Sequence, residues 1–157
     1  MSLAPEDLEL ARPNPGDLPG IVQLYRETIQ PVWDEHGRSY DLERIEENIR
    51  QRLASRDYWM TVARQGNTLL GYLAWEKHPD HTSHHVVAHL RMILVHPDTQ
   101  GAGLGKFLMA RFEASARAEG CTKILFDVVV GSPAYDFYRS RGYRHWSNYM
   151  EKFLNDE

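Results

Sequence analysis

The sequence is poor in cysteine, in basic excess and in long apolar runs, and each shortage excludes a class of protein. A single cysteine, Cys121, cannot form an internal disulfide, which fits a reducing cytoplasm. Lys and Arg number 18 against 22 Asp and Glu, a net charge of −4, whereas a nucleic-acid-binding protein usually carries a basic face. No apolar run approaches the roughly 20 residues of a membrane span. We therefore expect no nucleic-acid partner and no membrane segment.

The beginning of the chain, "MSLAPEDLEL", lacks the basic and then apolar order of a secretory leader. Together with the cysteine count, this predicts a cytoplasmic location. The 157 residues are enough to bury one hydrophobic core, and no internal repeat or linker interrupts them. We expect a single domain over residues 1–157.

Hydrophobic spacing in the first half predicts a strand at residues 8–12 and then a helix with Asp17 as its N-cap. The segment "IQPVWDEHGRSY" breaks the helical pattern and reads as a loop. Asp41 is expected to cap a second helix, with an apolar stripe at Leu42, Ile45, Ile49 and Leu53. Two strand-like runs flank Gly66-Asn67, which predicts a hairpin over residues 58–76.

The second half predicts a long strand at residues 86–95 and a helix from the glycine-rich stretch to Gly120. The run "KILFDVVV" reads as a strand that is central or parallel in its sheet. Ser132-Pro133 then begins a short helix, and "YRHWSNYMEKF" reads as a final strand. This order predicts an α/β fold with a mixed, mostly antiparallel central sheet flanked by helices.

Three glycines at alternate positions, Gly101, Gly103 and Gly105, stand between the long strand and its helix. A helix N-terminus presents unpaired N–H groups and partial positive charge. Glycines allow several amides to approach one phosphate because no Cβ obstructs it. The pattern suits a pyrophosphate, although a tight turn without any ligand would also use glycine.

Two common phosphate motifs do not fit this stretch. A Walker A loop requires G-x-x-x-x-G-K-[ST], but Gln100 replaces its first glycine and Phe107 follows Lys106. A dinucleotide-binding G-x-G-x-x-G fails as well, because Lys106 stands three residues after Gly103 and the preceding strands form a hairpin. Neither motif explains the glycines.

The remaining pattern is V-x-P-x-x-Q-G-x-G-x-G, from Val95 to Gly105. It resembles the acyl-CoA-binding motif [QR]-x-x-G-x-[GA] of the GNAT superfamily, the GCN5-related N-acetyltransferases. Downstream, "AYDFYRSRGY" resembles the second signature of that family, A-x-x-[FL]-Y-x-x-x-G-[FY]. The order of strands and helices is similar over nearly the whole chain. One departure is Gly131, where many members have asparagine, which puts a side-chain contact at that position in doubt.

The resemblance implies acetyl-CoA as cosubstrate, lying between the strands at residues 86–95 and 123–130. Its pyrophosphate would bind the amides of the glycine-rich turn, and its pantetheine arm would pair with the first of these strands. The Ile93 N–H would point at the thioester carbonyl. Lys106 either contacts a phosphate or faces solvent. The implied cosubstrate-binding residues are Ile93, Leu94, Val95, Gln100, Gly101, Ala102, Gly103, Leu104, Gly105 and Lys106.

The second signature makes Tyr138 the candidate general acid for the departing CoA thiolate, the alternative being a packing residue. An ordinary phenol has a pKa of about 10 and can donate at neutral pH. Where some family members carry a glutamate base, this chain has His89, which alternation would place on one face with Arg91 and Ile93. A surface or hydrogen-bonded histidine, Glu76 as the base, and a chain of water molecules remain alternatives.

Five histidines between positions 78 and 89 invite a metal interpretation, but their spacing matches no recognised zinc motif. We expect no metal site. Cys121 lies far in sequence from any catalytic histidine, so we interpret it as a buried or incidental thiol. The acetyl group is then expected to pass directly to an amine in a ternary complex.

The acceptor is expected to be a small-molecule amine or a peptide, bound by Trp33, Glu35, Tyr40 and Glu76. Aromatic and acidic side chains suit an amine cation, while a solvated acidic loop would have the same composition. A homodimer is compatible with the resemblance, although no apolar stripe specifies its interface. The competing hypothesis is a non-catalytic acyl-CoA sensor, which would keep the glycine turn without needing Tyr138.

Overall fold

The computed structural model describes residues 7–155, so the first six residues, on which the leader argument partly depends, lie outside the described range. The chain divides into two compact units, Met1–Phe126 and Asp127–Glu157, which are described separately. In the described part of the chain, no helix has the length and apolar character needed to cross a bilayer.

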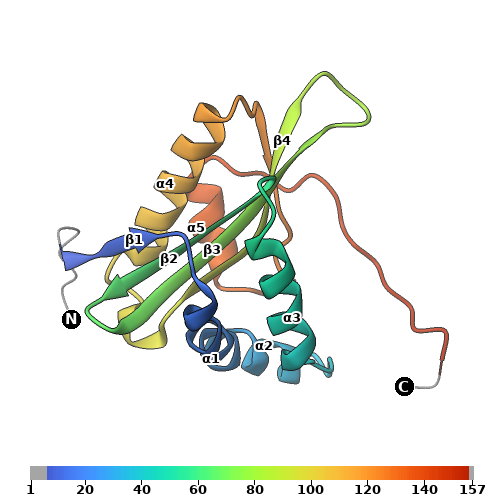
Figure 1. The fold of residues 1–157 in the computed structure, drawn as a ribbon. Coiled ribbons are helices and arrows are strands. Elements are labelled where there is room, and N and C mark those ends of the chain that lie inside the picture. The colour runs from blue at the N-terminus through green and yellow to red at the C-terminus, as the bar shows by residue number, and fades with distance from the viewer. Residues whose placement is uncertain (1–6, 156–157) are drawn as a thin grey trace. The chain divides into compact units, whose positions relative to one another are not determined.

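The first unit is built on a five-stranded sheet with the spatial order β1-β2-β3-β4-β5 (Figure 1). Neighbouring strands are antiparallel except for β4 and β5, which run parallel. The predicted mixed, mostly antiparallel sheet flanked by helices is confirmed. The strands are β1 (Glu9–Ala11), β2 (Tyr58–Gln65), β3 (Thr68–Pro79), β4 (Val86–Val95) and β5 (Lys123–Leu125).

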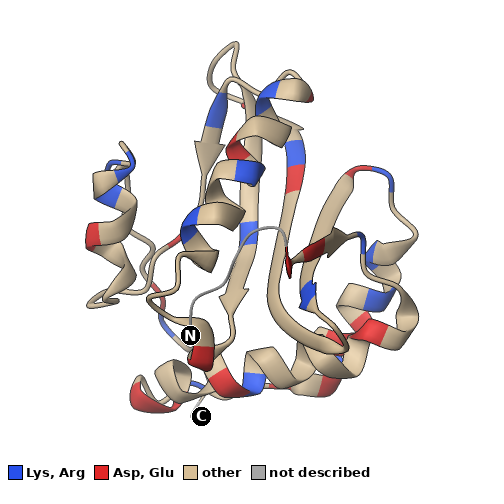
Figure 2. Cartoon of the chain, turned by 90° about the vertical axis from the view of Figure 1, so that its left-hand side faces the viewer, with Lys and Arg blue, Asp and Glu red and all other residues tan. Residues whose placement is uncertain are grey.

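Helices cover both faces of this sheet (Figure 1). On one face, α1 (Leu18–Thr28) and α3 (Leu42–Leu53) pack their apolar stripes against β2, β3 and β4. On the other face, α4 (Leu104–Ala118) places Phe112 against Trp75 with ring centroids 5.5 Å apart. The core is therefore two layers of side chains with the sheet between them. Acidic and basic residues are mixed along the chain (Figure 2).

The two expected helix caps have different outcomes. The carboxylate of Asp41 accepts a hydrogen bond from the Arg44 N–H at 3.0 Å, which confirms it as the N-cap of α3. Asp17 stands at the start of α1 but makes no side-chain cap. Its carboxylate instead accepts from the Asn14 N–H at 2.8 Å and pairs with Arg64. It stabilises the 3-10 turn η2 (Pro15–Asp17) that leads into the helix.

The loop expected over residues 29–40 is wrong in its first half, because Gln30–Glu35 forms the short helix α2. The amide of Ile29 donates to the Tyr25 carbonyl and the amide of Trp33 donates to the Ile29 carbonyl, so helical bonding continues from α1. Pro31 lies in the first turn, where its missing N–H costs nothing.

An irregularity in the β3–β4 pairing changes which side chains share a face. Trp75 pairs with Leu90 and Ala74 with Met92, which leaves Arg91 as the extra residue of a bulge. Because directly paired residues point to the same face, His89 lies on the face of Glu76 and Ala74. Ile93 pairs with Leu73 on the opposite face. The expectation that Ile93 shares a face with His89 is therefore wrong, whereas the Arg91 side chain does lie beside His89, as expected.

The strand predicted at residues 123–130 is too long, because β5 ends at Leu125. Its register with β4 runs only from Val87↔Lys123 to His89↔Leu125. Over the described residues of the first unit, β4 from Leu90 to Val95 pairs only with β3. The edge of β4 that faces the β5 side is thus without a strand partner over its second half.

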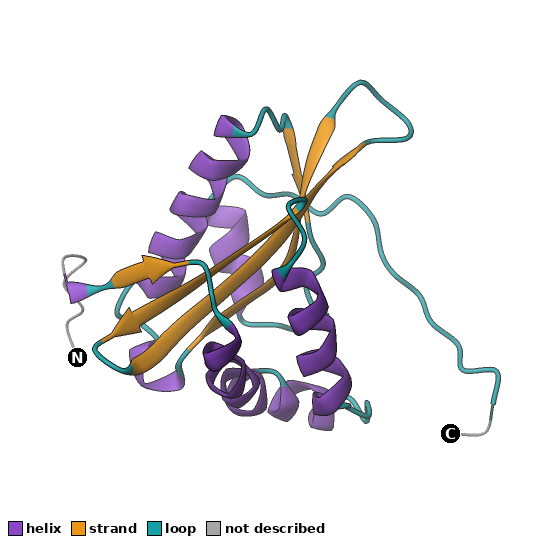
Figure 3. Cartoon of the chain, viewed as in Figure 1, coloured by secondary structure: helices purple, strands orange, loops and turns teal. Residues whose placement is uncertain are grey.

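The second unit contains one helix, α5 (Ala134–Ser140). Its N-cap is Pro133, one residue later than predicted, and the Ser132 hydroxyl oxygen accepts from the Ala134 N–H at 3.2 Å. The strand predicted at residues 143–153 is wrong, because this segment has no regular hydrogen-bonded structure in the described chain (Figure 3). Several of its apolar side chains are exposed, including Trp146 at 75% and Met150 at 95%.

Candidate active site

The glycine-rich turn is preceded by the 3-10 helix η3 (Pro97–Thr99), which follows β4 and stabilises the start of the turn. Thr99 is fully buried, and its hydroxyl donates to the His96 carbonyl at 2.8 Å. The ring Nδ1 of His96 accepts from the Asp98 N–H at 3.1 Å. These bonds hold the backbone that enters the turn in one conformation, so the amides that follow are fixed in direction.

The amides of the turn divide into two groups. Those of Gln100 and Ala102 donate inside the turn, to the Pro97 carbonyl at 3.3 Å and to the Thr99 carbonyl at 3.0 Å. The first amides of α4, by contrast, have no intrahelical acceptor, as at every helix start. Of the amides at residues 100–106 that were predicted to bind an anion, those of Gln100 and Ala102 are therefore already used within the turn.

Gly101 and Gly103 have φ angles of 82° and 89°, a region that L side chains rarely adopt. A Cβ added at either position would meet no atom within 4 Å, so the space that a side chain would occupy is open at both glycines. At Gly105 a Cβ would lie 3.7 Å from Val95 Cγ2, an ordinary contact. The turn thus offers backbone amides to an anion without a side chain in the way, which fits a pyrophosphate.

The second half of β4 lies beside this turn and offers its own backbone groups. Leu94 is fully buried in the core, while Ile93 and Val95 are half-buried. Their strand edge on the β5 side has no ladder partner among the described residues of the first unit. An extended ligand with amide groups, such as the pantetheine arm of acetyl-CoA, fits such an edge as an added strand does. Turn and edge together are suited to that cosubstrate.

A charged cluster surrounds Glu76 on the α3 face of the sheet. Its carboxylate pairs with Arg91, and its second oxygen lies 3.4 Å from Nη1 of Arg52. Burial acts to raise the pKa of Glu76, but the Arg91 hydrogen bond and the two guanidinium charges outweigh it and lower this pKa. Glu76 is therefore ionised and doubly paired at neutral pH.

His89 stands beside this cluster and contacts a second histidine. Its Nε2 lies 3.3 Å from Arg91 Nη1, and its Nδ1 lies 3.2 Å from Nε2 of His78. The Nδ1 of His78 is in turn 3.0 Å from the Pro79 carbonyl oxygen. The structure thus brings together His89 and Glu76, the two predicted base candidates, through Arg91.

Sequence reasoning missed His78 and Arg52 as members of this cluster, and it placed Arg91 beside His89 without its pairing to Glu76. Alternation along β3 places His78 on the same face as Glu76, which is a signal that was available in the sequence. Arg91 depends on the bulge, and Arg52 comes from α3, 24 positions away from Glu76. Neither of these two contacts follows from local pattern.

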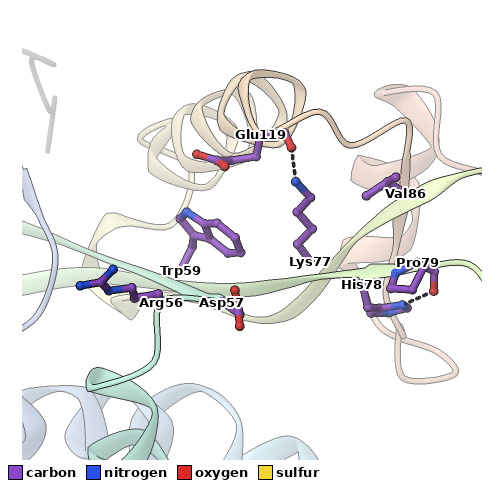
Figure 4. Close-up of a pocket in the computed structure, with 8 residues that line it drawn as sticks. All are labelled: Arg56, Asp57, Trp59, Lys77, His78, Pro79, Val86 and Glu119. Atoms are coloured by element: carbon purple, nitrogen blue, oxygen red, sulfur yellow. Dashed lines mark hydrogen bonds between the residues drawn. The ribbon is translucent and has the colours of Figure 1, made fainter.

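The end of β3 next to His78 also borders a hollow on the molecular surface (Figure 4). Lys77 extends toward α4, where its Nζ donates to the Glu119 carbonyl at 2.5 Å, while His78 bonds to Pro79 (Figure 4). The hollow lies near Val86, at the opposite end of β4 from Val95 and the glycine turn. It is lined by Arg56, Asp57, Trp59, Lys77, His78, Pro79, Val86 and Glu119.

Tyr138 lies on α5 in the second unit, packed against the rings of Phe137 and Tyr143 at centroid distances of 5.3 and 6.2 Å. Burial raises the pKa of its phenol above the ordinary value of 10.0. The hydroxyl therefore keeps its proton throughout the neutral and mildly alkaline range, as a proton donor requires.

The predicted acceptor-binding residues lie on α2, on β3 and, for Tyr40, in the loop between α2 and α3. Trp33 meets Tyr40 edge to face at 4.5 Å, and the guanidinium carbon of Arg38 lies 4.9 Å from the Trp33 ring centroid. The ring that was expected to attract an amine cation thus already holds a cation of this chain. Glu35 is exposed at the end of α2, and Glu76 belongs to the cluster on β3.

The histidine-rich turn between β3 and β4 is organised by Asp80. Its carboxylate accepts from the Thr82 N–H and hydroxyl, both at 2.9 Å, and from the Ser83 hydroxyl at 2.8 Å. Lys123 Nζ on β5 lies 3.2 Å from the same carboxylate. Among residues 7–155, no three His, Cys, Asp or Glu side chains come together as metal ligands would.

Cys121 is a buried thiol just after α4. Burial raises its pKa, and the charges of Lys77 and Glu119 act on it in opposite directions. A thiol held in its protonated form is a poor nucleophile. Cys121 is therefore a buried thiol with a raised pKa, as the sequence interpretation expected, and is poorly suited to act as a nucleophile.

Comparison with known proteins gives one family match and several similar folds. The family model described as "Acetyltransferase (GNAT) family" matches residues 18–143. No curated protein matches the chain. The fold is similar to a Trypanosoma brucei acetyltransferase, with 23% identity and a TM-score of 0.70 over 94% of this chain and 100% of that one.

Two further solved structures resemble the chain. An aminoglycoside acetyltransferase from an uncultured soil metagenomic sample has 22% identity and a TM-score of 0.71, covering 96% of this chain and 99% of the other. A ribosomal-protein-alanine N-acetyltransferase from Brucella melitensis has 19% identity and a TM-score of 0.72, covering 93% and 99%. At these identities the likeness establishes the fold, and the two proteins differ in the acceptors that their names describe.

Proposed function

Because the chain belongs to the GNAT acetyltransferase family, we propose that it is an N-acetyltransferase using acetyl-CoA. In this proposal the whole chain acts as one acetyltransferase domain, and the acetyl group passes to a primary amine of a small molecule or peptide in a ternary complex. The observation that carries the proposal is the open edge of β4 leading into a turn whose glycines point no side chain at an anion. The glycine turn connects this edge directly to the N-terminus of α4.

In this proposal the pyrophosphate is held by the amides of Gly101, Gly103 and the first turn of α4. The partial positive charge of the helix start favours the anion. Lys106, exposed on the first turn, adds a charge near the phosphates. The pantetheine arm pairs with Val95 and its neighbours, which delivers the thioester toward the middle of β4.

The Ile93 N–H is assigned to the thioester carbonyl, where it would stabilise the negative charge that develops as the amine attacks. Tyr138 is assigned as the general acid that protonates the departing CoA thiolate. Its raised phenol pKa supports this role, because the donor form is present at every pH at which the enzyme would work. A sensor that only binds acyl-CoA would have no use for such a group.

His89 is preferred over Glu76 as the general base. The lowered pKa of Glu76 makes its carboxylate a weak acceptor of protons, and both of its oxygens are already paired with arginine. Positions 89 and 93 are about 13 Å apart along an ideal strand, less the contraction at the bulge. The proton therefore travels from the amine to His89 through water rather than by direct contact.

The acceptor is proposed to enter over the α3 face, where Glu76, Arg91 and Arg52 stand beside His89. In this proposal the packed aromatic pair of Trp33 and Tyr40 also contributes to acceptor binding, and Glu35 supplies an exposed negative charge. The exposed carboxylate of Glu35 favours a cationic acceptor, whereas the charge of Glu76 is already matched by Arg52 and Arg91. We propose a cytoplasmic location, since the chain carries a single buried cysteine.

We also propose a homodimer. Among residues 7–155, the large apolar side chains that are more than about a third exposed all belong to the second unit. A second copy of the chain would bury the same segment in return. The residues concerned are Val129, Val130, Trp146, Tyr149, Met150, Phe153 and Leu154.

The proposed function is tested by thiol release from acetyl-CoA against a panel of polyamines, aminoglycosides, amino acids and peptides. Amine-dependent release is expected and would identify the acceptor class. Calorimetric titration with CoA accompanies this assay. CoA binding without thiol release from any amine would favour the sensor. The absence of both thiol release and CoA binding would refute the glycine-turn site.

The base assignment is tested with His89→Ala in the same assay. The acidic limb of the pH–rate profile should disappear, because the group that must be deprotonated is gone. A limb that stays at the wild-type pH would assign the base elsewhere.

A further inference from the structure

The hydrogen bonds through His89 and His78 begin and end on groups that have only one possible role. Arg91 can only donate, and the Pro79 carbonyl oxygen can only accept. Between them lie three contacts, from Arg91 Nη1 to His89 Nε2 at 3.3 Å, from His89 Nδ1 to His78 Nε2 at 3.2 Å, and from His78 Nδ1 to the Pro79 oxygen at 3.0 Å. Because the first group can only donate and the last can only accept, the donor and acceptor of each of these three hydrogen bonds are determined.

The direction of these bonds assigns the neutral form of each ring. Since Arg91 donates to His89 Nε2, that nitrogen carries a lone pair and the single ring proton is on Nδ1. This Nδ1–H donates to Nε2 of His78, so the proton of His78 is on its own Nδ1 and donates to Pro79. One pair of tautomers satisfies all three contacts, whereas a doubly protonated His89 would direct an N–H against the Arg91 donor.

From this series of hydrogen bonds we infer that His78 is a positioning residue. It holds the ring proton of His89 on Nδ1 and leaves Nε2 as the proton acceptor. The inference rests on the proposed role of His89 as the general base. During proton uptake an N–H bond of the acceptor amine breaks, through water, and an Nε2–H bond forms on His89. The Arg91 guanidinium moves off Nε2 and remains paired with Glu76.

His78 also stabilises the product of that step. The positive charge on His89 strengthens the bond from Nδ1–H to the neutral His78 ring, since hydrogen bonds with one charged partner are the stronger ones. His78 is itself oriented by Pro79, and the two rings are 5.5 Å apart between centroids. A residue at position 78 that cannot accept a hydrogen bond would lower the affinity of His89 for its proton.

Other charged and titratable groups surround the two rings and set the electrostatic background. Glu76 and Arg91 come from β3 and β4, and Arg52 comes from α3. Arg52 also stacks on Tyr58 of β2 at 4.4 Å, and Asp57 with Arg56 borders His78 in the hollow of Figure 4. Substitution at position 78 leaves all of these groups in place, so a changed titration would be attributable to the missing acceptor.

The tautomers are read directly by multiple-bond ¹H–¹⁵N correlation on the full chain labelled with ¹⁵N-histidine, at a pH where both rings are neutral. His89 should show the Nδ1–H tautomer, and its signals are assigned by their disappearance in His89→Ala. In His78→Leu the pKa of His89 should fall by about one pH unit, because its charged form loses a hydrogen-bond acceptor. In His78→Gln the amide oxygen can accept from Nδ1–H, so the wild-type titration should largely return.

Kinetic measurements separate positioning from general damage. The acidic limb of kcat should move to lower pH in His78→Leu, while KM for acetyl-CoA stays unchanged. His84→Leu, in the exposed turn nearby, is the matched control and should behave as wild type. A wild-type His89 with its proton on Nε2, or equal titrations for the Leu and Gln variants, would overturn the inference.

Failure of the base role is distinguishable from failure of this inference. An unchanged acidic limb in His89→Ala would refute the proposed base, and would end the catalytic part of the inference with it. The NMR result would still decide whether His78 sets the tautomer of His89, because that measurement requires no acceptor and no turnover.

Discussion

Gly103 is the residue at which backbone conformation and ligand access coincide. It has a φ of 89°, and a side chain there would project into open space beside the first turn of α4. Gly103→Glu should weaken CoA binding about 100-fold, because a carboxylate would face the pyrophosphate. Isothermal titration with CoA measures the loss.

Two matched variants separate charge from backbone strain at this site. Gly103→Ala carries the same conformational cost, about 1–2 kcal/mol, without a charge, so it should lower the Tm more than it lowers affinity. Gly105→Ala adds a Cβ at an ordinary 3.7 Å from Val95 Cγ2, so it should change neither the Tm nor the affinity for CoA. Equal affinity in Gly103→Glu and wild type would place the anion elsewhere.

Tyr138 is the residue whose role depends on a single oxygen. Tyr138→Phe keeps the ring that packs on Phe137 and Tyr143, so the Tm should change little while kcat falls about 100-fold. Its raised pKa fixes the sign of the pH effect, since the donor form is lost only as pH rises through a value above 10. The wild-type kcat should therefore show no alkaline limb from this group at neutral and mildly alkaline pH, and full activity of the variant would remove Tyr138 from the acid role.

At the scale of elements, Asp80 ties the β3–β4 turn to β5. Hydrogen bonds from Thr82 and Ser83, and then the Lys123 ammonium, lower the pKa of this carboxylate below its ordinary value of 3.8. A depressed pKa contributes stability that is present above the unfolded pKa and is lost as pH falls through the folded one. The turn should therefore loosen only in strong acid.

Asp80→Ala should remove this acid-sensitive contribution at neutral pH. We expect faster hydrogen exchange at the Thr82 amide and a lower Tm, with the difference from wild type shrinking as the pH is lowered below 4. Asp34→Ala, at an exposed position on α2, is the control. Unchanged exchange at Thr82 would mean that the turn is held by its backbone alone.

Elements with strong periodicity were predictable, and those that depend on distant partners were not. The capped helix α3, the hairpin and β4 follow from spacing and from turn residues close in sequence. The short helix α2 was missed because Pro31 and Gly37 resemble loop punctuation, although proline is tolerated in a first helical turn. Overprediction of β5 has the opposite cause, since an apolar run such as residues 126–130 does not specify which strand it will pair with.

The site was predictable to the same extent. The glycine turn is recognisable because its residues are contiguous in sequence. Tyr138, the candidate general acid, is recognisable in the same way because it lies within the short second signature. The cluster of Glu76, Arg91 and His89 required the bulge, whose single extra residue reverses the alternation that sequence reasoning applies to β4.

At the scale of the whole molecule, the exposed apolar segment near the C-terminus bears on assembly. Light scattering after size exclusion should give a mass of twice 18.2 kDa. Met150 and Leu154 are 95% and 88% exposed, so Met150→Asp with Leu154→Asp should shift the mass to that of one chain. Asn148→Asp adds a charge at a polar position of the same segment and should leave the dimer intact. A wild-type mass of 18.2 kDa would contradict the dimer.

The open edge of β4 has a thermodynamic consequence for the fold. A ligand that occupies the edge binds only the native chain, so its binding free energy adds to the free energy of unfolding. At a CoA concentration 100 times Kd this amounts to about 2.7 kcal/mol, or roughly 5–10 °C in Tm for a chain of this size. Gly103→Glu should show no such shift. Ranking acyl-CoA thioesters by the melting temperature they produce would then reveal which acyl chain is accommodated beside the open edge of β4. No acceptor amine needs to be known for this measurement.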